Sequence, residues 1–192
     1  MLMDNKFFTL IKPYLNYIDE GKLYKQPFRI LYQVIAVVML LVPFALLYQL
    51  IDTGIFKHGT AGMIVAFILI WFVVAAAGWF SFQLWWERAG QLSQTSQQGD
   101  DFVATPVVSN LLQTFGEWLG SYMAVVGFLS TLIAMIFMGN TAGLGVIPGI
   151  GGGNGLWGLI SFPIAGFITI VVFRWLAEMM RALVAIANNT RK

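Results

Sequence analysis

The chain has 192 residues, of which 58% are hydrophobic and 10% are charged, with a formal net charge of +2 and no cysteine. Soluble domains carry about 25% charged residues, so this composition excludes an ordinary soluble protein. The lack of cysteine excludes disulfides, thiolate catalysis and cysteine-bound metals. We predict an all-α integral membrane protein, because the apolar runs are as long as the roughly 20 residues that cross a bilayer as a helix.

Residues 1–27 are predicted to form a cytoplasmic segment that contains an amphipathic helix. The basic residues Lys6 and Lys12 lie beside apolar residues at helical spacing, which are Phe7, Ile11, Tyr14, Leu15 and Ile18. A basic amphipathic helix of this kind lies in the plane of the inner membrane surface. Pro13 falls inside the pattern and can kink the helix. The less favoured alternative is a helix exposed to solvent.

Four apolar runs follow, and we predict that they form four transmembrane helices packed as an antiparallel bundle. This domain covers residues 28–189 and is followed by a cytoplasmic tail at 190–192. Its spans are residues 28–50, 61–86, 116–138 and 157–177. A four-helix bundle is the simplest architecture that buries such helices against one another.

The third and fourth helices are expected to be longer than the bilayer is thick. Thr105 offers an N-cap for the third helix and Pro106 a first helical position, so this helix is predicted to run to Met138. The fourth is predicted to run from Gly158 to Asn189. Each exceeds a membrane span by about ten residues, so the two helices should project together into the cytoplasm.

The distribution of lysine and arginine predicts the orientation of these spans. Ten of the eleven basic residues lie before the first span, between the second and third spans, or at and beyond the end of the fourth. Only Lys57 lies on the other side. The positive-inside rule then places both termini and the 87–105 loop in the cytoplasm, and the 51–60 and 139–157 loops outside.

The outer loop at 139–157 contains the sequence GNGLWG, which matches the G-x-G-x-x-G pattern of dinucleotide-binding sites. That pattern binds a pyrophosphate only between a strand and a helix, and the preceding residues GNTAGLGVIPGI form no strand. We therefore predict no cofactor. Two interpretations of the loop stay open: a surface connector, which is favoured, or a re-entrant loop packed against protein.

Six charged residues are predicted to gather at the cytoplasmic boundary of the membrane: Glu87, Arg88, Glu117, Arg174, Glu178 and Arg181. Counting from the outer helix ends places Glu117 and Arg181 at similar depths, so they can pair between helices. Arg174 has Glu178 four residues on, the spacing of a pair within one helix. The favoured role is a structural clamp, then a partner contact, and last proton or ion handling, because no charge lies mid-membrane.

Small residues recur every four positions on the third and fourth helices, where they allow close helix packing. The two stripes are Gly116, Gly120 and Ala124, and Ser161, Ala165 and Thr169. Packing inside the bundle is the expected use of these stripes. A stripe that is not used for packing inside the bundle can face another subunit.

The C-terminal run FRWLAEMMRALVAIANNTRK resembles the end of a class of small, uncharacterised bacterial inner-membrane proteins. Their last membrane helix carries Arg-x3-Glu, followed by a tail of hydrophobic residues and asparagine. Arg174, Glu178, Ile186 and Asn189 occupy those positions here. The resemblance implies a multi-pass protein of the bacterial cytoplasmic membrane and no known activity.

The leading functional hypothesis is a non-catalytic membrane subunit, accessory protein or scaffold of a larger bacterial inner-membrane assembly. Its expected partners are the lipid bilayer and other membrane subunits or copies of itself, with no nucleic acid. We predict no catalytic residue and no metal ligand, and hence no enzyme. The alternative is a small homo-oligomeric channel or transporter, although few polar groups lie within the spans. A lipid-modifying enzyme ranks third, because no span carries paired acids, a histidine cluster or an activated serine.

Overall fold

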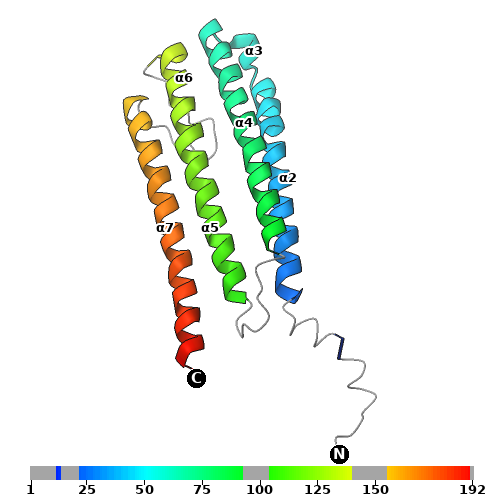
Figure 1. Ribbon diagram of the computed structural model, residues 1–192. Helices are drawn as coiled ribbons and strands as arrows, with labels where there is room; N and C mark the ends of the chain where they lie inside the picture. The colour runs from blue at the N-terminus through cyan, green and yellow to red at the C-terminus, as the bar shows by residue number, and fades with distance from the viewer. Residues whose placement is uncertain (1–11, 14–21, 93–103, 140–154, 191–192) are drawn as a thin grey trace, which may run out of the picture.

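The computed structural model describes residues 12–13, 22–92, 104–139 and 155–190 (Figure 1). The elements in these ranges are all helical, and four helical segments are long and apolar enough to cross a membrane. The prediction of an all-α chain with four membrane-length helices is therefore confirmed. Nearly all of the predicted amphipathic helix and of the glycine-rich loop lies outside the described residues, so both stay predictions.

The first span corresponds to α2, Lys22–Asp52, and the second to α4, Ala61–Gln91. The fourth corresponds to α7, Gly155–Thr190. The third span, called the third helix below, consists of three consecutive segments: α5, Ala104–Tyr122; the π-helix η1, Met123–Gly127; and α6, Phe128–Met138. A short helix, α3, Ile55–His58, lies between α2 and α4.

Two details of the third helix differ from the sequence prediction. The helix begins at Ala104, so Thr105 lies inside its first turn and is not the N-cap. The helix is also not uniformly α-helical, because η1 interrupts it. A threonine N-cap is found instead at α4, where the Thr60 hydroxyl accepts a hydrogen bond from the Met63 backbone N–H at 3.4 Å.

The four long helices lie side by side in an open row, in the order α2, α4, third helix and α7, and α2 also approaches α5 (Figure 1). Neighbours in this row are antiparallel. Among the described residues, no Cα atom of α7 lies within 8 Å of α2 or α4. The expected bundle is therefore not a closed ring, and the third helix is the one neighbour of α7 among the described helices.

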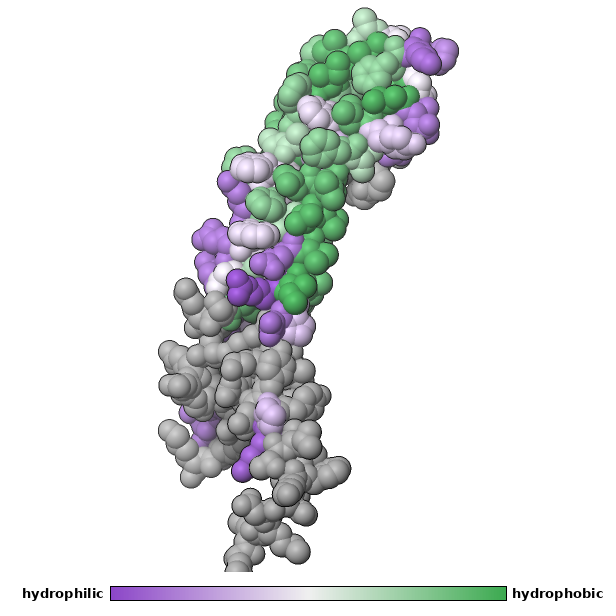
Figure 2. Space-filling view, turned by 90° about the vertical axis from the view of Figure 1, so that its right-hand side faces the viewer, coloured by the Kyte–Doolittle hydropathy of each residue, from purple (hydrophilic) through white to green (hydrophobic). Residues whose placement is uncertain are grey.

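The long helices have two ends along their axes, and these ends differ in chemistry. At one end α2 and α5 begin and α4 and α7 end, and we call it the charged end. We call the opposite end the loop end. Figure 2 looks onto the α2 edge, where a band of hydrophobic residues runs along most of the described length and hydrophilic residues gather at the upper right and lower left. A cluster around Tyr32 and Trp85 fills the core near the charged end, and one around Phe67 and Ile70 fills it near the loop end.

Pro43 shapes the contact between α2 and α4. It has no N–H group, so the Met39 carbonyl one turn earlier receives no helical hydrogen bond. Gly78 of α4 lies directly against this carbonyl, and a Cβ atom there would come within 2.9 Å of the oxygen. The indole N–H of Trp71 donates to the Pro43 carbonyl at 2.8 Å. Pro43 thus lies in the contact between α2 and α4, and α2 continues past it as a helix.

Glycines allow the third helix and α7 to approach closely. A Cβ atom on Gly120 would collide with the Gly166 carbonyl, and one on Gly166 with the Gly120 carbonyl. Gly116 packs against the Phe173 side chain in the same way. At Gly120 and Gly166 the two backbones therefore touch without an intervening side chain, an arrangement that holds helices together in lipid.

The α7 face in this contact is not the predicted one. It contains Gly158, Gly166 and Ala177, which are buried. The predicted stripe lies beside this face, where Ala165 is one residue from Gly166 and about 100° round the helix from it. In that stripe Ser161 is exposed, and Ala165 and Thr169 are half-buried. Of the two predicted stripes, only the one on the third helix lies at the centre of this contact.

Substitution of Gly120 by alanine is expected to lower the free energy of unfolding by about 2 kcal/mol, because the added methyl group forces two backbones apart. The control is Gly90→Ala, since a Cβ atom at Gly90 has nothing within 4 Å. It should be neutral or slightly stabilising. Reversible unfolding in mixed micelles measures both. Equal losses in the two variants would contradict the close contact.

Candidate functional site

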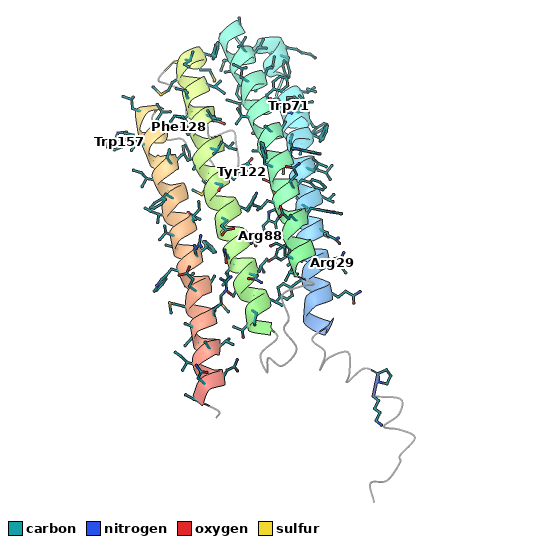
Figure 3. All side chains as sticks on the ribbon, viewed as in Figure 1. Arg29, Trp71, Arg88, Tyr122, Phe128 and Trp157 are labelled. Atoms are coloured by element: carbon teal, nitrogen blue, oxygen red, sulfur yellow. The ribbon has the colours of Figure 1, made fainter. Side chains whose placement is uncertain are left out.

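A chain of polar side chains links α4, α5 and α7 at the charged end. Arg88 Nη2 lies 2.8 Å from Glu117 Oε2, which joins α4 to α5. The Gln113 amide donates to the other Glu117 oxygen at 2.7 Å. Arg181 of α7 donates to the oxygens of Gln113 and Asn110. In Figure 3, Arg88 lies on the side of α4 that faces α5. Three helices are thus cross-linked through one carboxylate and two amides.

The sequence prediction that Glu117 pairs with Arg181 identified the right neighbourhood but not the contact. The two charges lie on adjacent helices but are joined through Gln113. Asn110 was also overlooked. The available signal was spacing, since 110, 113 and 117 recur at helical intervals on one face of α5.

The three other predicted charges lie apart from this chain. Arg174 pairs with Glu178 at 3.3 Å along α7, and their side chains are 60% and 61% exposed. Glu87 accepts a hydrogen bond from Gln91 at 3.5 Å near the end of α4. Among the described residues, the six charges therefore do not form one network.

A polar cavity of about 300 Å³ lies beside the chain of polar side chains, and we call it the polar cavity. All four long helices, with the residue that follows α4, contribute to its walls. Its lining residues are Tyr32, Arg88, Gln91, Leu92, Asn110, Gln113, Thr114 and Arg181. Arg181 is exposed at its rim, whereas Tyr32 is only 1% exposed. The cavity thus extends from the surface of the row towards its core.

The Tyr32 hydroxyl has no hydrogen-bond partner although it is buried. The Thr114 side chain lies close enough to act on it as a hydrogen-bonding group, but the two side chains do not meet strict hydrogen-bond geometry. The Tyr32 ring is fixed by an edge contact with Trp85, with ring centroids 5.1 Å apart. Buried hydroxyl groups without a partner are rare and carry a desolvation cost, so this group marks a place where a partner is missing.

A second, apolar cavity of about 400 Å³ lies between α4 and the third helix. It exists because α4 packs closely on α6 but less closely on α5. Its walls include Phe80 and Leu84 of α4 and Tyr122 and Val125 of the third helix. The Trp118 indole donates to Ser81 across it at 2.9 Å. Glu117 lines this cavity and its partner Arg88 lines the polar one, so their ion pair stands at the boundary of both.

A double-mutant cycle on Arg88→Gln and Glu117→Gln should give a coupling free energy of about 1 kcal/mol or more. The reason is that both side chains are partly buried, at 35% and 22% exposure, so solvent screens their interaction less than that of an exposed pair. The matched control is the same cycle on Arg174 and Glu178, where solvent reduces the coupling to about 0.3 kcal/mol. Unfolding in mixed micelles measures both. Equal couplings would show that the Arg88–Glu117 pair has no special structural role.

Comparisons with known proteins assign no relative to this arrangement. No protein-family model matches the sequence, and no curated protein or solved structure shows significant similarity to it. The resemblance seen in the C-terminal run therefore has no support from these comparisons. Any functional conclusion therefore rests on the sequence and the geometry of the chain itself.

Proposed function

We propose that this chain is a non-catalytic membrane subunit or scaffold that holds another membrane protein against its α7 edge. The observation that carries the proposal is the open row. Within α7 the buried residues are Gly155, Gly158, Gly166 and Ala177, all on the side of the third helix. Large apolar side chains cover its other faces, with Phe167 67% exposed and Trp175 58% exposed. Lipid or protein must cover this surface.

The small residues on α7 favour protein over lipid on one of its faces. Ser161, Ala165 and Thr169 lie beside the centre of the contact with the third helix, where Ser161 is exposed and the other two are partly buried. Thr169 donates its hydroxyl to the Ala165 carbonyl at 2.8 Å, so this stripe exposes no unsatisfied hydroxyl at that position. Small residues do not improve the packing of mobile lipid chains on α7, but they let a second helix approach the α7 backbone. The stripe therefore supports a helix of another subunit as the occupant.

We further propose the bacterial cytoplasmic membrane as the location, with both termini in the cytoplasm. The proposal is supported by the basic residues, which concentrate at the charged end and in the segments that flank it. It is also supported by the resemblance in the C-terminal run. The charged end would then face the cytoplasm.

Purification of the tagged chain from its native membrane in mild detergent should recover a membrane protein in stoichiometric amount. Ala165→Leu should reduce that recovery about fivefold or more, because the larger side chain blocks close approach of a helix. Val171→Leu is the control, since Val171 is also exposed on α7 but lies about 120° round the helix. Mass spectrometry and native sizing give the readout. A homo-oligomer without other proteins would contradict the proposal and favour the small channel or transporter.

Because the chain has no cysteine, single cysteines can report its orientation without interference. Asn189→Cys lies at the charged end and Lys57→Cys at the loop end, and both positions are exposed. In intact cells with a permeable outer membrane, an impermeant maleimide should label position 57 and not position 189. Disruption of the inner membrane should then expose position 189. The reverse pattern would overturn the proposed orientation.

A further inference from the structure

The polar cavity combines several hydrogen-bond donors with an excess of positive charge. Arg88 and Arg181 reach it from α4 and α7, and Glu117 is the carboxylate bonded to this group. These three side chains therefore leave a charge of +1. Within the described part of the chain, Arg181 has no carboxylate partner and contacts only the neutral oxygens of Asn110 and Gln113. Its positive charge is positioned but not neutralised by the protein.

Both guanidinium groups keep donors available for a ligand. In the hydrogen bonds shown among the described residues, Arg88 and Arg181 each use only Nη2. A guanidinium group has five N–H donors, so Nε and Nη1 of each remain available. Planar groups of this kind bind phosphate and carboxylate oxygens through paired hydrogen bonds.

The base of the cavity points to a ligand independently of these charges. Tyr32 lines the cavity, is 1% exposed, and its buried hydroxyl has no hydrogen-bond partner. A hydroxyl group can donate one hydrogen bond to an anionic oxygen. An oxyanion in the cavity would thus give the buried Tyr32 hydroxyl an acceptor of good geometry, which the protein does not supply.

We propose that the polar cavity binds a phosphate-type oxyanion between Arg88 and Arg181, with the Tyr32 hydroxyl as a third donor. Its volume of about 300 Å³ is sufficient for a phosphate group. Two sources share this chemistry: the headgroup of an anionic phospholipid, or phosphate from solution. The adjoining apolar cavity, which meets the polar one at the Arg88–Glu117 pair, offers space for a lipid chain. This site does not depend on whether a partner covers α7.

The experiment uses the full chain in an uncharged detergent and measures thermal unfolding, because a ligand that binds the folded state raises Tm. One arm adds inorganic phosphate. The other adds phosphatidylglycerol, with phosphatidylcholine as the lipid whose headgroup carries no net charge. A rise in both arms, or with phosphate alone, supports a site reached from solution. A rise with phosphatidylglycerol alone supports a lipid headgroup site. No rise in either arm would overturn the proposal.

Two variants connect any binding to this cavity. Arg181→Gln should weaken the affinity about tenfold, because it removes a charge-assisted contact. Arg174→Gln removes the same charge from the same helix at a position outside the cavity, so it should leave the affinity unchanged. Equal effects of these two variants would show that binding depends on general charge and would overturn the site.

Tyr32→Phe gives a signature that a purely structural role would not produce. It should weaken binding and at the same time raise Tm without ligand, because it removes a buried hydroxyl that has no partner. It also tests the site if Arg181→Gln does not fold. An unchanged affinity in Tyr32→Phe would overturn the role of the hydroxyl.

Discussion

The contact between the third helix and α7 is the constraint on which the rest of the structure depends. Because α7 has no other neighbour among the described helices, its position is determined by the backbone contact at Gly120 and Gly166. That contact sets the level at which Ser109 donates to the Ala177 carbonyl at 2.9 Å. It also brings Arg181 to α5, where its side chain lines the rim of the polar cavity. A change in this contact would therefore alter the site as well as the fold.

The same principle recurs at the other helix contacts. Gly78 packs on the Met39 carbonyl between α2 and α4, and Gly62 packs on the Phe137 carbonyl between α4 and α6. Surrounding lipid is as apolar as the side chains, so burial alone does not drive such helices together, and close packing decides which faces meet. Neighbouring helices in the row pack closely where a glycine allows their backbones to meet. Between α4 and α5, where contact is looser, the apolar cavity remains.

The features set by local chemistry were predictable from the sequence. Long apolar runs predicted the four membrane-length helices, and the rise per residue predicted that Glu117 and Arg181 lie at similar levels. The order of helices, the interruption at η1 and the α7 contact face were not predictable, because small residues occur on more than one face and only packing selects between them. The bridging role of Gln113 was overlooked for a similar reason, since an amide on a helix usually faces solvent.

Disulfide cross-linking in the membrane tests the open row most directly. Ser109→Cys with Ala177→Cys should link, because these positions meet between α5 and α7. Leu41→Cys on α2 and Val172→Cys on α7 lie at similar depth, each nine residues from a residue that lines the polar cavity, Tyr32 and Arg181. In an open row this pair should form no link within one chain. An efficient intramolecular link between α2 and α7 would show a closed bundle and contradict the arrangement.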